Sequence, residues 1–149
     1  MIKNKNLVFS IPFMIIGITM IILGARWILV PDPWMLDQVA NEERLGITFN
    51  QLFKSEINQT LPDYLRQIYT FFGLWVIVIG LFISFFSTPD IIKNQFVRIA
   101  LLICIGTMIS AGTVLGYVWI PNSPFIYLSW GLILLYFTSV YGHFKIENH

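Results

Sequence analysis

Four long runs of apolar residues dominate the chain, at about 7–30, 64–87, 95–119 and 124–142. The hydrocarbon core of a bilayer is about 30 Å thick and a helix rises about 1.5 Å per residue, so about 20 apolar residues make one span. A transmembrane barrel would instead show alternating segments of about ten residues. The continuous runs therefore predict four transmembrane helices.

The long polar segment at about 32–60 predicts a cap of two amphipathic helices. Pro33 suits a first helical position, and Gly46 suits the end of that helix. Between them, Val39 belongs to the predicted apolar stripe and Asp37 to the opposite, polar side. The run from Thr48 to Gln51 then has the form of a capping box, which begins a second helix. We expect one all-α domain over 1–149, a four-transmembrane-helix bundle whose outer loop forms this cap.

Composition supports a membrane protein, because 56% of the 149 residues are hydrophobic and only 11% are charged. Lys3 and Lys5 ahead of the first apolar run would also fit a signal peptide. The apolar run is too long for that, and Leu23 stands where a cleavage site needs a small residue. We therefore expect the first run to remain as a span.

The distribution of Lys and Arg predicts the orientation. The N-terminus, the second connection and the C-terminus hold five basic residues against two acidic ones, a net charge of +3. The other side holds four basic residues against six acidic ones, a net charge of −2. Since cytoplasmic loops retain Lys and Arg, both termini are expected in the cytoplasm. The richness in Ile, Asn and Lys is typical of a bacterial protein, which would place the chain in the inner (plasma) membrane.

Small residues recur at helical spacing within the spans. Lipid gives helices little hydrophobic reason to associate, so close backbone approach at small residues matters more than in water. We expect them to be packing positions within the chain, and a homodimer surface is the alternative. The predicted packing residues are Gly17, Gly24, Gly73, Gly80, Gly106, Ser110, Gly112 and Gly116.

No acidic residue, lysine or histidine lies deep in a span, which argues against proton-coupled transport. The two histidines, His143 and His149, lie near one end, so neither haem nor another metal is expected. The single cysteine, Cys104, excludes a disulfide within the chain and is expected to be a small core residue. We predict no cofactor, no metal and no catalytic residue.

Two arginines near the outer ends of spans are the candidate site. Arg26 and Arg66 are expected at the same level, where they would either snorkel to lipid phosphate or pair with nearby aspartates. The functional alternative is an anion-holding or headgroup-holding pocket beneath the cap. Its predicted walls are Trp27, Tyr69, Tyr117 and Trp119.

The stretches from Gly24 to Pro31 and from Asp63 to Tyr69 resemble small bacterial four-helix membrane proteins of the DoxX-like kind. In that family the first span ends in a proline after a Gly-rich stretch, and an Arg-x-x-Tyr, here Arg66 to Tyr69, begins the second. The resemblance covers about half of the chain. It implies a four-helix bundle and no settled activity.

These patterns favour a non-enzymatic accessory or lipid-interacting bundle. The alternative is a carrier or enzyme for a hydrophobic or amphiphilic anion held near Arg26 and Arg66. Membrane lipid is the expected partner, with another protein or a second copy of the chain as further candidates, and no nucleic acid is expected.

Overall fold

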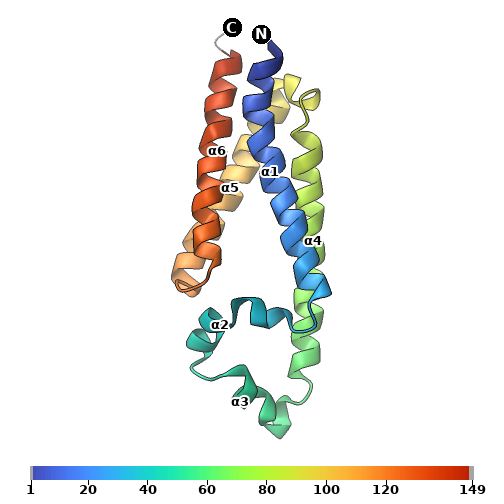
Figure 1. The fold of residues 1–149 in the computed structure, drawn as a ribbon, viewed down its shortest axis with the longest axis vertical. Coiled ribbons are helices and arrows are strands. Elements are labelled where there is room, and N and C mark those ends of the chain that lie inside the picture. Colours follow the sequence, from blue (N-terminus) through green and yellow to red (C-terminus); the bar gives the residue numbers. More distant parts are fainter. Residues whose placement is uncertain (1, 148–149) are drawn as a thin grey trace.

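The chain is all helical in a computed structural model that describes residues 2–147, with side chains from Lys5 onward (Figure 1). Residues 2–147 contain no strand, and four of the helices are long and apolar enough to cross a membrane, as predicted. The elements are α1 (Ile2–Leu29), η1 (Pro33–Asp37), α2 (Gln38–Leu45), α3 (Phe49–Lys54), η2 (Glu56–Asn58), α4 (Leu61–Phe86), η3 (Ile91–Lys93), α5 (Gln95–Trp119) and α6 (Phe125–Glu147).

Helix α1 is the centre of the bundle. It begins beside α6, at the end of the molecule where both chain ends lie, and finishes beside α4 (Figure 1). Helix α5 packs mainly on α6 and scarcely touches α4. The pairs α1–α4 and α5–α6 therefore separate away from the chain ends, and the short helices between α1 and α4 lie across that opening (Figure 1).

Four glycines bring α1 and α4 into backbone contact. A Cβ atom on Gly17 would lie 2.7 Å from the carbonyl oxygen of Gly80, and one on Gly24 would lie 2.5 Å from that of Gly73. The two helices are antiparallel, so seven residues forward on α1 match seven residues back on α4. In this pair, a side chain larger than hydrogen would force the helices apart.

Serine hydroxyls extend the contacts of α1 toward the chain ends. The same seven-residue step leads to Ser10, whose hydroxyl donates to the carbonyl oxygen of Ser87 on α4. On the other side of α1, the Ser139 hydroxyl of α6 donates to the Phe9 carbonyl oxygen at 2.9 Å. All three serines are buried, so the Ser10 and Ser139 hydroxyls find hydrogen-bond partners across the helix contacts rather than in water. The Ser87 hydroxyl donates to the Ile83 carbonyl oxygen of its own helix.

The small residues of α5 differ from the prediction. Gly106 lies against the ring of Tyr136, whose hydroxyl donates to the Leu102 carbonyl oxygen at 3.1 Å. Gly116 lies against Ile126, but a Cβ on Gly112 would meet nothing within 4 Å, and Ser110 is exposed. Gly112 and Ser110 are therefore not close packing positions within the described chain, and the homodimer alternative stays a prediction.

A buried arginine that the sequence did not single out joins α5 to α6. The Arg98 side chain is 5% exposed and forms an ion pair with Glu147. It also donates to the carbonyl oxygen of Ile92 at 2.8 Å and to Nδ1 of His143 at 3.4 Å. Since every nitrogen of the guanidinium has a partner, this cluster fixes the end of the bundle where the chain begins and ends.

The segment 31–60 contains the two short helices, with a different helical phase from the prediction. Gly46, at φ 67°, ends α2, and the predicted capping box of Thr48 and Gln51 begins α3. The first helix opens as a 3₁₀ turn, η1, which has 3.0 residues per turn instead of 3.6. As a result Val39, predicted on the apolar stripe, is 70% exposed, while Asp37, predicted on the polar side, turns inward.

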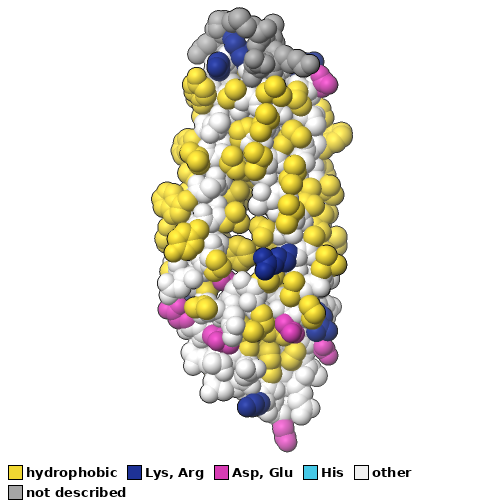
Figure 2. All heavy atoms as spheres, in the orientation of Figure 1, with side chains coloured by type: hydrophobic (Ala, Val, Ile, Leu, Met, Phe, Trp, Pro, Cys, Tyr) yellow, Lys and Arg dark blue, Asp and Glu magenta, His cyan; other side chains and the backbone are white. Residues whose placement is uncertain are grey.

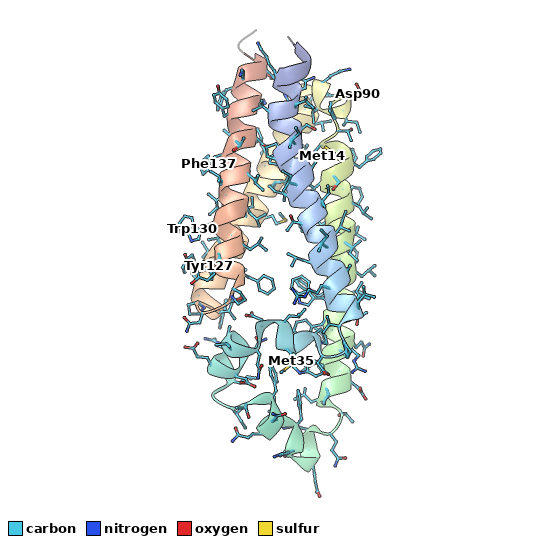
Figure 3. All side chains as sticks on the ribbon, in the orientation of Figure 1. Met14, Met35, Asp90, Tyr127, Trp130 and Phe137 are labelled. Carbon is cyan, nitrogen blue, oxygen red and sulfur yellow. The ribbon has the colours of Figure 1, made fainter. Side chains whose placement is uncertain are left out.

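The surface of the long helices is mainly apolar. On the face seen in Figure 2, most charged side chains lie toward the two ends of the molecule. Tyr127, Trp130 and Phe137 of α6 point away from the other helices (Figure 3), and each is more than half exposed. Cys104 is also exposed rather than a core residue. Such an outer surface suits lipid as the surrounding solvent.

Candidate functional site: a chamber beneath the 31–60 segment

A cavity of about 390 Å³ lies where the helix pairs separate. We call it the chamber, and α1, η1, α2, α4, α5 and α6 all contribute to its lining. Its aromatic walls are Trp27, Phe72, Trp119 and Phe125, and its polar side chains are Asp37, Asn41, Tyr69 and Ser129. A mainly apolar cavity with a few convergent polar groups is the usual form of a small-molecule site.

Contacts between α2 and the α5–α6 connection hold the 31–60 segment over the chamber. The side-chain amide of Asn122 donates to Glu43 at 2.6 Å. The guanidinium of Arg44 lies 4.3 Å from the ring centroid of Trp119, which is a cation–π contact. Both contacts are on the surface, and each is individually weak.

An aromatic cluster stiffens the same segment from within. Trp34 is buried, and its ring lies 5.5 Å from that of Phe53 and 6.4 Å from that of Phe49. The Asn41 amide donates to the Trp34 carbonyl oxygen at 3.3 Å, which connects this cluster to the chamber. The 31–60 segment is therefore a folded unit of the protein rather than an open loop.

The aromatic walls come from four different helices, α1, α4, α5 and α6. Trp27 of α1 is the central ring, 4.9 Å from Phe72 of α4 and 5.6 Å from Phe125 of α6. Rings at these distances attract one another through their edges and faces. They form a rigid apolar surface on which the body of a bound molecule can lie.

Asp37 is the only charged side chain in the chamber lining. Its Oδ1 atom is buried and has no hydrogen-bond partner within the described chain. Burial raises the pKa of the Asp37 carboxyl, and a hydrogen bond with the Ser123 hydroxyl opposes that rise in part. A buried carboxyl with an unused oxygen is costly, and it is relieved by a proton or by a bound donor.

Tyr69 and Asn41 stand beside that carboxyl. The Tyr69 hydroxyl and the Asn41 side chain are within hydrogen-bonding reach of each other, and Tyr69 is close enough to Asp37 to feel its charge. The group can therefore offer both acceptors and donors to a polar head. The chamber lining includes neither His nor Cys.

Of the six residues predicted for the site, Trp27, Tyr69 and Trp119 line the chamber. Tyr117 does not, because its hydroxyl accepts a hydrogen bond from the Trp130 indole at 3.1 Å on the exposed side of α5 and α6. Sequence analysis missed Asp37 as a site residue. The periodicity of 33–45 placed it on the polar, outward side, and only the 3₁₀ turn reverses that placement.

The two arginines do not meet in the chamber, so a pocket built on both is not what the structure forms. Arg66 donates from Nε to the Pro31 carbonyl oxygen at 2.8 Å and lies 3.9 Å from Asp32. The Arg26 side chain is exposed on α1 and makes no hydrogen bond or ion pair with residues 5–147. Their placement agrees with the other interpretation, in which Arg66 pairs with a loop aspartate and Arg26 faces the surroundings.

A second cavity, of about 520 Å³, lies between α4 and α5 where these helices scarcely touch. We call it the α4–α5 groove. All of its lining side chains are apolar or sulfur-containing, among them Phe82, Phe86, Ala100 and Cys104. Both helices are long and apolar enough to cross a membrane.

The fold and the chamber define an all-helical protein with four helices able to cross a membrane and a folded segment across one end. Comparison of the chain with protein-family models, curated proteins and solved structures gave no match. The resemblance to DoxX-like proteins therefore stays a prediction. Within the described residues, no group of three or more His, Cys, Asp or Glu side chains could hold a metal ion.

Proposed function

We propose that the protein is a non-enzymatic, lipid-interacting four-helix bundle of the bacterial inner (plasma) membrane. Both termini lie in the cytoplasm and the 31–60 segment caps the outer end. The observation that carries the proposal is the α4–α5 groove, a long apolar cavity open toward the surroundings of two membrane-spanning helices. In a bilayer, an acyl chain is the material available to fill it.

The pattern of helix contacts explains why there is space between α4 and α5. Helices α1 and α4 are held together by glycine contacts, and α5 is held by α6, but nothing comparable joins α4 to α5. An empty cavity of this size would forfeit the dispersion contacts of every lining atom. A lipid chain lying in the groove restores those contacts and completes the bundle.

Native mass spectrometry of the protein in a non-ionic detergent with added phospholipid tests this function. We expect one or more lipids to stay bound to the full chain. Ala100→Phe puts a ring into the groove and should lower the retained lipid, whereas Val114→Phe, on the exposed side of α5, should not. Equal retention in the two variants, or none in the wild type, would overturn the proposal.

The accessory role has a distinct signature in the same preparation. A larger protein that co-purifies in fixed ratio would support it, and a second copy of the chain would support a homo-oligomer. The other candidate function, a carrier or enzyme for an amphiphilic anion, needs Arg26 and Arg66 in one cavity. Neither side chain lines the chamber, so no specific observation favours it.

A further inference from the structure

The chamber lining contains the carboxyl group of Asp37, and none of the described residues that line the chamber is basic. Burial and the Ser123 hydrogen bond are the influences on Asp37, and no basic side chain is among them. None of Arg26, Arg44 and Arg66 lines the chamber. Arg66 is engaged with Pro31 and Asp32, and Arg44 with the ring of Trp119. Asp37 is half-buried, but its Oδ1 atom is buried and has no hydrogen-bond partner among the described residues. A buried carboxyl oxygen normally has a donor, so this one points to a partner from outside the chain.

The rest of the chamber indicates which partner. The rings of Trp27 and Phe72 offer the apolar body of a bound molecule a large contact surface. Leu115 and Ile126 add aliphatic surface. One carboxyl among aromatic and aliphatic walls suits a molecule with a positive head and an apolar body.

We propose that the chamber binds an amphiphilic organic ammonium compound, with its cationic group at Asp37 and its apolar body against Trp27 and Phe72. The Tyr69 hydroxyl and the Asn41 amide lie at the polar end, where they can accept or donate to the head group. This site is separate from the α4–α5 groove, so the proposal can fail while lipid binding in the groove holds, and the reverse.

Three probes of equal chain length test the proposal: octylammonium, octanol and octanoate. They are titrated into the full chain in an uncharged maltoside detergent, because a detergent with a quaternary ammonium head would compete. Tryptophan fluorescence reports binding, since Trp27 and Trp119 line the chamber. Octylammonium should bind at least about tenfold more tightly than octanol, because a charge-assisted hydrogen bond to Asp37 is added to the same apolar contacts. Octanoate should bind weakest.

Asp37→Asn keeps the shape and removes the charge. In this variant the ratio of the octylammonium affinity to the octanol affinity should fall to about one. Octanol should still bind, which would show that the chamber is folded. Asp32→Asn is the matched control, since that carboxylate lies on the same segment with its side chain 58% exposed, and it should keep the full preference. If octylammonium acted only on the detergent micelle, its effect would be the same in the wild type, in Asp37→Asn and in Asp32→Asn.

The wild-type titrations decide the proposal even if a variant does not fold. Equal affinity for octylammonium and octanol, or tighter binding of octanoate, would overturn it and leave Asp37 as a group that takes up only a proton. A preference that persists in Asp37→Asn would also overturn it. The preference of the wild type together with its loss in that variant supports it.

Discussion

Gly24 on α1 and Gly73 on α4 each occupy the space that the other's side chain would need. A Cβ on Gly24 would lie 2.5 Å from the Gly73 carbonyl oxygen, and a Cβ on Gly73 would lie 2.6 Å from the Gly24 carbonyl oxygen. One heptad away Gly17 and Gly80 repeat the relationship, and one heptad in the other direction Arg66 donates to the Pro31 carbonyl oxygen. The α1–α4 pair therefore keeps one register from end to end.

The first prediction concerns this register. Gly24→Ala and Gly73→Ala should each destabilise the protein by about 1–3 kcal/mol, because the added methyl group meets backbone that cannot move alone. Gly131→Ala is the control, since a Cβ there meets nothing within 4 Å. Thermal unfolding in detergent measures the difference. If Gly24→Ala and Gly131→Ala melt alike, the close contact of α1 and α4 is contradicted.

Ser10 gives a prediction about polar contacts between helices. Ser10→Ala removes the hydroxyl that donates to the Ser87 carbonyl oxygen and should cost about 0.6–1.7 kcal/mol, the range of such bonds in membrane bundles. Thr138→Ser and Thr138→Ala should be nearly silent, because that exposed hydroxyl bonds only to Leu134 of its own helix. Chemical unfolding of these variants, followed by circular dichroism, tests the claim. A Thr138 loss equal to that of Ser10 would refute it.

The ion pair of Arg98 and Glu147 predicts coupled losses. Glu147→Gln leaves the buried guanidinium without its counter-charge and should cost about 1–3 kcal/mol, less than for a fully buried pair because the Glu147 side chain is 35% exposed. Arg98→Lys should also destabilise, since one ammonium cannot replace the forked contacts to Glu147, Ile92 and His143.

A double-mutant cycle measures that coupling. Arg98→Met with Glu147→Gln should cost less than the sum of the single changes, because the pair is removed together. Lys93→Gln provides the contrast, since the side chains of Lys93 and Asp90 are 66% and 91% exposed and such surface pairs contribute little. Strict additivity at Arg98 and Glu147 would argue against a direct interaction.

Asp37 gives a prediction about pH. Burial raises the pKa of its carboxyl above the ordinary value of 3.8, so the folded state holds the proton more tightly than the unfolded state does. The stability linked to this group is therefore full below the unfolded pKa and is lost as the pH rises through the folded pKa. At pH values above the folded pKa, Asp37→Asn should raise the melting temperature of the unliganded protein. Below pH 3.8 it should have little effect.

The measurement is a pair of melting curves for wild type and Asp37→Asn across that pH range. The gap between them should widen with rising pH, because only the wild type must bury a charge. Asp32→Asn should show no such widening, as its carboxylate is exposed. A gap that is constant with pH would contradict the burial of Asp37.

The topology is tested by labelling single cysteines with a membrane-impermeant maleimide in a Cys104→Ala background. Ser55→Cys should react in intact cells, and Lys145→Cys only after the membrane is opened, because the excess of basic residues predicts cytoplasmic termini. Both positions are exposed, so access depends on the side of the membrane. Reaction in the opposite order would reverse the orientation.

Several features followed from the sequence because they depend on near neighbours in the chain. The four long helices result from continuous apolar runs, Gly46 ends α2 because it adopts φ 67° without a Cβ clash, and Thr48 caps α3 through Gln51. The heptad spacing of Gly17 with Gly24, and of Gly73 with Gly80, was also visible. The spacing could not predict which helices contact each other.

Tertiary structure decided the partners of those residues and the position of the site. The glycines of α1 face those of α4 while Gly112 faces none, because α5 packs on α6 and leaves its other side open. The positions of Asp37 and Arg66 also depend on how the helices are arranged. A 3₁₀ turn rotates Asp37 into the space between separating helices, and Arg66 is drawn to the end of α1 by the antiparallel register. The periodicity of the sequence determines which face of each helix is apolar or carries small residues. The distances between the helices decide which of these faces contacts another helix.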